Sequence, residues 1–471
     1  MRSKPCIAFL SLAISAMAGI SAYAESKTRP NIIYINADDL GVMDVGFNNP
    51  RYRTPNIDKL RAEGMLFTNA YAPASNCAPS RACVFSGQYA PRHGVYTVGN
   101  SDRGKSRDRK LIPIPNTEHL TADNFTLAEA LQQGGYKTIH LGKWHLGRDP
   151  LSQGFEVNIG GDKGGSPTGG YFVPFKSGSM KRYNRQYPKG THRVDIFADQ
   201  AIKFMRANKD HAFFMHMAYY SVHSRIEAVP EFIDHYKGKP VNAPYASMIE
   251  KMDQGIGRIL DELEKLGLKE NTLVLFCSDN GALRNISSQK PYRSGKGSYF
   301  EGGIREPLVV RWPTVVPAGS TCDTPVIGTD FYPTFLAAAG IPKPSDKILD
   351  GVSMLPLLKE EGTIPDRALF WHFPIYLEKY VNQDYESHDS QFRTRPGSAL
   401  RMGKWKLHEY FEDGRIELYD LEADLGERNN LAQSHPEKAS ELHAVLNQWR
   451  KQLDAPVPAE LNQKFVADPA K

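Results

Sequence analysis

Short apolar runs alternate along the chain with longer segments in which apolar residues recur every three or four positions. The runs predict buried strands, because each is short and carries few charges; they lie at 31–36, 137–141, 212–218, 272–277 and 308–311. The periodic segments predict amphipathic helices at 55–63, 127–133, 195–208, 245–266 and 329–339. Strands that alternate with helices indicate an α/β fold with a large, mostly parallel mixed sheet sandwiched by helices.

Two of these helices carry further local signals. Thr126 and Glu129 form the capping-box pattern at the start of 127–133. The segment 245–266 places an apolar stripe on one side: Met248, Met252, Ile256, Ile259 and Leu263. The stripe predicts a long helix packed against the sheet, with its methionines in the core.

The last quarter of the chain follows a different pattern. The runs 399–409 and 416–419 predict strands joined by a turn at Asp413-Gly414. The periodic segment 436–453 predicts a helix. We therefore expect a small α+β unit made of an antiparallel sheet and a packed helix.

The boundary between the two patterns is expected near Lys347. Pro342, Pro344 and the polar residues after them mark a connection rather than an element. We predict an N-terminal domain at 25–347, which would hold the functional site, and a C-terminal subdomain at 348–471.

The start of the chain has the pattern of a secretory signal peptide at 1–24. Two basic residues precede an apolar run over 6–20, and Ala-Tyr-Ala at 22–24 resembles a cleavage site. The run is shorter than the ~20 residues typical of a membrane-spanning helix, so a cleaved signal is favoured over an anchor. We expect an exported protein, periplasmic or secreted, with no membrane span.

Charge and cysteine content narrow the class of protein further. The formal net charge of +5 is small and dispersed, which argues against nucleic acid as a partner. Of five cysteines, Cys6 lies within the predicted signal. If Cys77 is set aside, Cys83, Cys277 and Cys322 allow at most one intramolecular disulfide. Cys277 lies in an apolar run and is expected in the core.

Polar side chains directly follow four of the predicted strands. They are Asp38 and Asp39, Lys143 and His145, His223, and Asp279 and Asn280. Because α/β sheets bind ligands beyond the carboxyl ends of their strands, we expect these side chains to converge on one site. Lys143 and His145 lie two positions apart, so on an extended segment they would point the same way.

The donors in this set suit a hard cation and an anionic substrate. Side-chain oxygens come from Asp38, Asp39, Asp279 and Asn280. Such ligands favour Ca²⁺ or Mg²⁺, and a crowded, flexible oxygen set favours Ca²⁺. Positive charge and protons come from five further residues: Arg81, Lys143, His145, His223 and Lys296. A cation surrounded by bases is typical of a group-transfer site.

The stretch 76–87 reads N-C-A-P-S-R-A-C-V-F-S-G. Asn76 is a favourable N-cap and Pro79 is tolerated in a first turn, so a helix is predicted to begin here. Cys77 would then lie at the positive end of the helix dipole, with Arg81 one turn along. This arrangement attracts anions.

Together these motifs resemble the formylglycine-dependent sulfatases of the alkaline-phosphatase superfamily, over residues 31 to about 311. The matching segments occur in family order: N-A-D-D-L-G, C-A-P-S-R, G-K-W-H-L-G, S-D-N-G and G-K-G-S-Y-F-E-G-G. Ser86-Gly87 stands where the family usually has Thr-Gly. The resemblance implies an alkaline-phosphatase-like fold. It also implies a maturation enzyme that oxidises Cys77 to formylglycine, an aldehyde whose hydrate is the nucleophile.

The resemblance also assigns roles to the residues of the set. It implies a Ca²⁺ ion, with Mg²⁺ less favoured, held by Asp38, Asp39, Asp279, Asn280 and the modified Cys77. It implies that Arg81 and Lys143 steady the formylglycine hydrate. It implies that the sulfate group is held by Lys143, His223 and Lys296.

The mechanism implied by the resemblance begins with attack of one hydroxyl of the hydrate on sulfur. Asp279 is near enough in the family to help deprotonate that hydroxyl. His223, assisted by Lys296, protonates the leaving alcohol, a general-acid contribution of ~10²–10⁴-fold. His145 then takes the proton of the second hydroxyl as sulfate is expelled and the aldehyde returns.

The expected substrate is a sulfated carbohydrate, of galactose type and held at a chain end in a pocket. The loop 164–175, with G-G-S-P-T-G-G-Y-F, looks like loops of bacterial polysaccharide sulfatases. Arg393, Arg395 and His372 are candidate sugar contacts in the tail.

Two other functions are weighed against this one. A phosphatase or phosphonate monoester hydrolase of the same superfamily shares the metal-binding acids, but Cys77 with Pro79 and Arg81, and a single metal set, favour sulfate. A non-catalytic exported binding protein could keep the cation. It would have no need to retain Cys77 together with the four bases Lys143, His145, His223 and Lys296.

Overall fold

The computed structural model describes residues 29–147, 149–380, 386–387 and 389–467. The predicted signal peptide at 1–24, with Cys6, lies outside the described residues. Within the described ranges, no helix combines the length and the apolar character needed to cross a bilayer.

A mixed sheet of eight strands forms the centre of the molecule, in the order β5-β4-β6-β1-β7-β8-β2-β9. Neighbouring strands are parallel except β8, which runs antiparallel to both β7 and β2. The strands are β1 Asn31–Ala37, β2 Met65–Phe67, β4 Lys137–Gly142, β5 Val157–Ile159, β6 Phe213–Ala218, β7 Thr272–Ser278, β8 Leu308–Arg311 and β9 Ser320–Cys322. All five predicted strands are confirmed, and the three that were missed have only three residues each.

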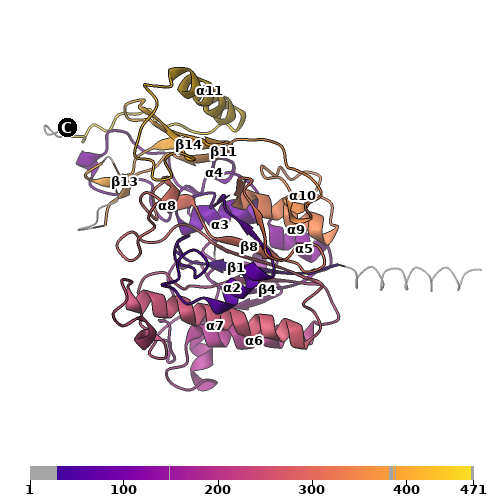
Figure 1. Cartoon of the computed structure of the whole chain (residues 1–471). Helices are drawn as coiled ribbons and strands as arrows, with labels where there is room; N and C mark the ends of the chain where they lie inside the picture. The colour runs from indigo at the N-terminus through magenta and orange to yellow at the C-terminus, as the bar shows by residue number, and fades with distance from the viewer. Residues whose placement is uncertain (1–28, 148, 381–385, 388, 468–471) are drawn as a thin grey trace, which may run out of the picture.

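Helices cover both faces of this sheet (Figure 1). One face carries α2 Pro55–Ala62, α6 Arg193–Ala207 and α7 Ala243–Lys265. The other carries α3 Cys77–Ser86, α5 Leu127–Gln133, α9 Phe331–Ala339 and α10 Leu355–Leu358. In β1, Ile33 and Ile35 pack into the core under α6 and α7, whereas Ile32 and Tyr34 pack into the opposite core. Successive side chains of a strand point to opposite faces, so a strand buried on both sides is apolar throughout.

The local helix signals are confirmed. Thr126 accepts a hydrogen bond from the Glu129 backbone at 3.2 Å, and Glu129 accepts one from the Thr126 backbone at 2.7 Å. The predicted apolar stripe of α7 is fully buried: Met248, Met252, Ile256, Ile259 and Leu263. The helix α7 therefore lies against the sheet along most of its length.

A second, four-stranded antiparallel sheet follows, in the order β11-β14-β15-β16. Its strands are β11 Leu369–Phe373, β14 Gly397–Met402, β15 Trp405–Tyr410 and β16 Ile416–Asp420, and α11 Pro436–Gln452 packs on it. The prediction of one strand over 399–409 is wrong, because the run folds back on itself between β14 and β15. Gly403 makes this turn with a φ of +56°, a left-handed conformation that glycine adopts without strain.

Short elements complete the fold. They are β3 Ala70–Tyr71, β10 Val326–Ile327, β12 Leu377–Glu378, β13 Phe392–Thr394, α4 Ala90–His93 and α8 Glu301–Ile304, with 3₁₀ turns η1 Ser106–Asp108, η2 Pro150–Gln153, η3 Ser179–Arg185, η4 Ile233–Tyr236 and η5 Gly328–Asp330.

The C-terminal sheet makes buried contacts with the first part of the chain. Trp371 of β11 donates a hydrogen bond to the Ala72 carbonyl at 2.9 Å and packs edge-on against Tyr71 at 5.5 Å. Lys406 of β15 pairs with Glu301 of α8 at 2.9 Å. The C-terminal sheet is thus packed onto the first part of the chain, and the boundary near Lys347 stays a prediction.

Candidate functional site

Four adjacent strands of the large sheet, β4, β6, β1 and β7, end at one level. The register aligns Gly142 with Ala218, Asn36 with Ala218, and Ala37 with Ser278. The residues that follow these positions therefore emerge at one edge of the sheet, where α/β folds bind ligands. This alignment brings together the strand-end residues singled out in the sequence.

Three carboxylates crowd at this edge. One oxygen each from Asp38, Asp39 and Asp279 lies within 4.8 Å of the others, and all three residues are buried. Asn280 donates to Asp39 at 2.9 Å. Its own buried Oδ1 atom has no hydrogen-bond partner among the residues that the structure describes. Crowded acids beside an unpaired acceptor form an electronegative site that suits a cation.

The loop that carries Asp39 is held by buried hydrogen bonds. Asp39 has a φ of +62°, which is uncommon for a residue other than glycine. Asp44 accepts hydrogen bonds from the Gly41 backbone at 3.0 Å and from the Tyr245 hydroxyl at 2.8 Å. Leu40 donates to the Ser278 hydroxyl at 3.0 Å. The sequence analysis missed Asp44, although a third acid soon after the Asp38-Asp39 pair was a usable signal.

Basic side chains face the carboxylates one to one. The Lys143 Nζ atom donates to both oxygens of Asp38 at 2.8 Å. The Lys296 Nζ atom lies 2.6 and 2.7 Å from the two oxygens of Asp39. Burial opposes the charge of each lysine, but the paired carboxylate and the other anionic groups nearby together outweigh burial and raise the lysine pKa. Both ammonium groups are therefore held charged in a buried site.

Arg81 joins the helix α3 to this cluster. Its Nε atom donates to Asp279 at 2.9 Å, and its guanidinium donates to the Lys143 carbonyl at 2.9 Å. Arg81 is 1% exposed, so its charged guanidinium lies inside the protein and not at the surface. It fixes the distance between the helix start and two strand ends.

Cys77 begins α3 as predicted, but Asn76 does not cap the helix with its side chain. The Asn76 amide instead donates to Thr97 at 3.2 Å. The Lys296 ammonium donates to the Cys77 sulfur at 3.3 Å. Burial raises the pKa of the thiol, yet the charges of Lys143 and Lys296 outweigh it and lower the pKa of Cys77 to about 6.

The two histidines occupy opposite electrostatic environments. The Nε2 atom of His223 lies 3.9 Å from Asp39, and despite burial the carboxylates raise the pKa of His223. Burial and the charges of Lys143 and Arg81 hold the pKa of His145 well below its usual value. His145 has a φ of +63°, so the segment after β4 is not extended as expected. Its buried Nδ1 atom has no hydrogen-bond partner within the described part of the chain.

The predicted loop 164–175 packs directly behind these histidines. A Cβ atom on Gly165 would lie 2.5 Å from the His145 ring, so only glycine fits there. Tyr171 is buried and donates to the carbonyls of Tyr220 at 2.7 Å and His223 at 3.0 Å. This part of the loop therefore packs against the His145 ring and holds the backbone of Tyr220 and His223 by hydrogen bonds.

The three tail residues expected to contact sugar lie in different surroundings. His372 is buried, and its ring nitrogens bond to the Ser398 hydroxyl at 2.8 Å and the Pro456 carbonyl at 3.0 Å. The expectation of a sugar contact is therefore wrong for His372, which belongs to the C-terminal core. Arg393 donates to the Lys296 carbonyl at 3.3 Å, and Arg395 pairs with an acid in a neighbouring pocket.

Comparisons with known proteins identify related families and structures. The sulfatase family model matches residues 30–341, and the model for the N-sulphoglucosamine sulphohydrolase C-terminal region matches residues 295–454. A sulfatase of Formosa agariphila is 32% identical, and the match covers 92% of this chain and 90% of that protein.

Two further matches extend the comparison. The N-acetylgalactosamine-6-sulfatase of Homo sapiens is 30% identical, and the match covers 92% of this chain and 87% of that protein. The solved structure of Ps i-CgsB in complex with k-i-k-neocarrahexaose is 28% identical with a TM-score of 0.73, and covers 92% of this chain and 95% of that one. On the extent of the family match and these relatives, the chain belongs to the sulfatase family, a family of sulfuric ester hydrolases.

Proposed function

We propose that this sulfuric ester hydrolase removes sulfate from a sulfated carbohydrate, using formylglycine made from Cys77 and a bound Ca²⁺ ion. The observation that carries the proposal is the convergence at one sheet edge. Asp38, Asp39 and Asp279 gather within 4.8 Å, and the Lys296 ammonium that pairs with Asp39 also reaches the Cys77 sulfur at 3.3 Å. An acid cluster and a candidate nucleophile thus share one lysine.

The residues present fit a hard cation. The three carboxylates offer closely spaced oxygens, and the unpaired Oδ1 atom of Asn280 is a further neutral acceptor in the described structure. Such an oxygen set is typical of Ca²⁺, and Mg²⁺ is less favoured because it demands a more regular geometry. We propose Asp38, Asp39, Asp279, Asn280 and the modified Cys77 as ligands. When bound, the cation would offset the charge of the sulfate oxygens.

The surroundings of Cys77 fit a modified nucleophile. Formylglycine would supply a hydrated aldehyde whose hydroxyl attacks sulfur. Cys77 and Arg81 are 2% and 1% exposed. A maturation enzyme that reads C-A-P-S-R could therefore reach the segment only before the chain folds. We propose that modification precedes folding and export.

The remaining residues of the site bind the substrate and move protons. Lys143, Lys296 and His223 would hold the sulfate oxygens. The ammonium groups of the two lysines face the centre of the cluster. Arg81 and Lys143 would steady the nucleophile. The Nε2 atom of His223 lies 3.9 Å from Asp39, and the carboxylates raise the pKa of the ring. His223 would therefore be protonated and could protonate the leaving oxygen. Asp279 would help deprotonate the attacking hydroxyl, and His145, kept neutral by burial and nearby positive charge, would accept the proton of the second hydroxyl as sulfate leaves.

The relatives support a galactose-type sugar. One relative is named an N-acetylgalactosamine-6-sulfatase, and one structural neighbour is solved with a neocarrahexaose. The experiment is a screen for released sulfate, with protein co-produced with a maturation enzyme and offered sulfated galactose, N-acetylgalactosamine and glucosamine units. Release from a galactose-type unit is expected. Faster release of phosphate from an aryl phosphate than of sulfate from the aryl sulfate would contradict the proposal.

A mass measurement separates the proposal from a non-catalytic binding protein. Conversion of the Cys77 thiol to an aldehyde lowers the mass of its peptide by about 18 Da. The shift is expected in active protein. Full activity in protein whose Cys77 peptide is unshifted would contradict the role given to formylglycine.

A further inference from the structure

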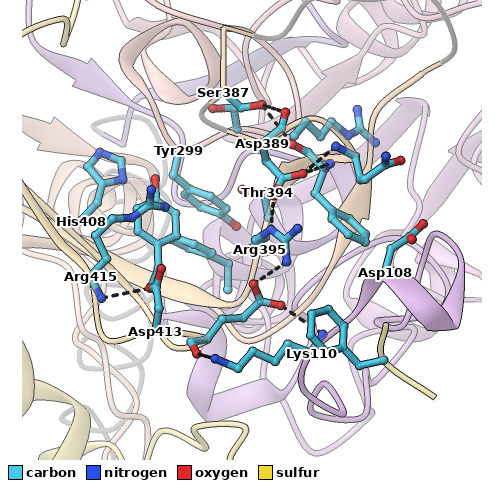
Figure 2. A pocket seen from close by; sticks show the side chains of 18 of the residues that line it. Asp108, Lys110, Tyr299, Ser387, Asp389, Thr394, Arg395, His408, Asp413 and Arg415 are labelled. Atoms are coloured by element: carbon cyan, nitrogen blue, oxygen red, sulfur yellow. Dashed lines mark hydrogen bonds and ion pairs between the residues drawn. The ribbon is translucent and has the colours of Figure 1, made fainter. Parts of the chain in front are cut away.

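A cavity lies beside the strand-end site, and we call it the C-terminal pocket. It encloses about 620 Å³ between the segments 107–110, 298–300, 391–395, 408–415 and 465–467, with Ser387 and Asp389 also in its lining. Neither Cys77 nor any of the clustered carboxylates lines it. Figure 2 shows Tyr299, Thr394 and Arg395 near its centre, with Asp389 and Lys110 towards opposite ends.

The pocket shares a wall with the site of sulfate cleavage. Ser298 and Tyr299 line it and follow Lys296 by two and three positions, a reach of at most ~11 Å along an extended chain. Arg393 donates to the Lys296 carbonyl at 3.3 Å. A Cβ atom on Gly297 would lie 2.6 Å from the Arg393 side chain. The lysine expected to hold sulfate and the pocket wall are therefore packed together.

The charges of the pocket are mixed and largely paired. Five basic and four acidic side chains line it. Arg395 bonds to both Asp389 and Glu412, and Lys110 donates to the Glu412 carbonyl at 2.6 Å. A small anion would meet these carboxylates, and an apolar ligand would desolvate nine charged groups. The lining instead suits a neutral, hydroxyl-rich ligand that both donates and accepts hydrogen bonds.

Aromatic faces add an apolar component. Tyr299 and Phe373 stack at 3.8 Å between ring centroids, and both line the pocket. Tyr410 also lines it, with the Arg415 guanidinium 4.4 Å from its ring centroid. Tyr299 and Phe373 are almost fully buried, so the partly exposed Tyr410 is the ring on which a sugar could bury its C–H groups while its hydroxyls bond to the surrounding carboxylates and guanidinium groups. Peptides and apolar cofactors match this combination less well.

We propose that the C-terminal pocket binds a second sugar unit of the same saccharide whose sulfate ester is cleaved at Cys77. The inference rests on the proposed carbohydrate substrate and makes that substrate an oligosaccharide rather than a single sugar. A cavity of this volume lies within the range of ~300–1,000 Å³ that is typical of ligand sites. Chain length, and not only the sulfated unit, then sets the affinity.

The test compares two substrates and three variants. Sulfate release is measured on N-acetylgalactosamine 6-sulfate and on a chondroitin 6-sulfate tetrasaccharide. Thr394→Trp fills the pocket, and Arg415→Ala opens it. The Arg415 side chain is 41% exposed, so this second variant should fold even if Thr394→Trp does not. Lys404→Ala, which removes an exposed partner of Asp420 outside the pocket lining, is the control.

The wild type is expected to show a KM about tenfold lower for the tetrasaccharide than for the monosaccharide. Thr394→Trp and Arg415→Ala should bring the ratio of the two KM values towards one, and Lys404→Ala should not change it. Equal KM values in the wild type, or an unchanged ratio in both pocket variants, would overturn the proposal.

A binding measurement keeps this result separate from the proposed function. The desulfated chondroitin tetrasaccharide has no ester to cleave, and calorimetry on the full chain should detect its binding and an about tenfold weakening in Thr394→Trp. Absence of binding to the wild type, or equal binding by Thr394→Trp, overturns the pocket assignment. Absence of sulfate release from every saccharide, with tetrasaccharide binding intact, would overturn the proposed function instead.

Discussion

Two clusters of buried charge can be compared within this molecule. The strand-end cluster gathers Asp38, Asp39 and Asp279 with Arg81, Lys143 and Lys296 beside Cys77. The inter-sheet cluster joins α8 to the C-terminal sheet and consists of Glu301, Arg305, Lys406, His408 and Glu427. Most of these side chains are almost completely buried. Burial of charge alone therefore does not identify the functional site.

The inter-sheet cluster has a partner for each carboxylate oxygen. Glu301 contacts Lys406 at 2.9 Å with one oxygen and Arg305 at 2.8 Å with the other. Glu427 contacts Lys406 at 2.9 Å with one oxygen and accepts the Glu301 backbone N–H at 2.6 Å with the other. These contacts connect distant parts of the chain.

The carboxylates of the strand-end cluster are paired as well, but other buried polar atoms beside them lack hydrogen-bond partners among the described residues. The Asn280 acceptor and the His145 Nδ1 atom have no partners in the ranges that the structure describes, and the nearby thiol has its pKa lowered to about 6. Unpaired buried groups cost free energy, so their presence needs an explanation such as a bound ion or substrate. The comparison teaches that an unpaired buried acceptor beside crowded acids, together with a thiol of lowered pKa, and not charge density, marks the reactive cluster.

The largest expected effect is that of Cys77→Ala. Loss of the nucleophile should reduce sulfate release by at least roughly 10⁴-fold. The melting temperature should stay close to that of the wild type, because the side chain fills little volume. Cys322→Ala, at a half-buried free cysteine, is the control and should keep full activity. Substantial turnover by Cys77→Ala would place the chemistry elsewhere.

The next effect is that of His223→Gln on the leaving group. Removal of the proposed acid should slow release from a sugar sulfate by ~10²–10⁴-fold. Release from nitrophenyl sulfate should fall much less, because a stable phenolate needs no proton. His235→Gln, an exposed histidine paired with Glu250, is the control. Equal losses on both substrates would argue against the acid role.

The inter-sheet cluster should respond in stability instead of activity. Lys406→Met leaves Glu301 and Glu427 without their shared partner, and the expected loss is about 3–5 kcal/mol in the free energy of unfolding. Lys404→Met, at a lysine that is 40% exposed, should cost much less than Lys406→Met. Denaturant unfolding measures both, and folded Lys406→Met should retain the wild-type kcat. A stable Lys406→Met variant would show that the cluster does not hold the sheets together.

The smallest expected effect is a change in the pH dependence of stability. Burial of Glu301 is outweighed by Lys406 and Arg305, which hold the pKa of its carboxyl well below the usual value. This contribution is complete above the unfolded pKa of about 4.3 and is lost as the pH falls towards the folded pKa. Glu301→Gln should therefore flatten the acid side of the stability profile. An unchanged slope would argue against a charged Glu301.

Much of the strand-end site could be predicted because local sequence determines it. Asp38, Lys143 and Asp279 each follow an apolar run, and a parallel sheet brings such positions to one edge. The inter-sheet cluster has no comparable signal, since Glu301 lies in the short helix α8 and Lys406 inside strand β15, and no strand-end rule brings such positions together. The Asp44 and Tyr245 bond spans 201 positions and was missed for the same reason.

Local conformations set a second limit on prediction. Asn76 has the right residue type for an N-cap, but its side chain makes no capping hydrogen bond and instead donates to Thr97. The run 399–409 has strand propensity throughout, yet the left-handed Gly403 divides it. In both cases a tertiary contact or a single backbone angle decides between options that the sequence leaves equal.

Calcium titration by calorimetry tests the central claim most directly, because it asks which buried cluster accepts a cation. The account predicts one Ca²⁺ site per chain in the wild type, its loss in Asp279→Asn, and its retention in Glu301→Gln. Ca²⁺ binding that survives Asp279→Asn, or that is absent from the folded wild type, would contradict it.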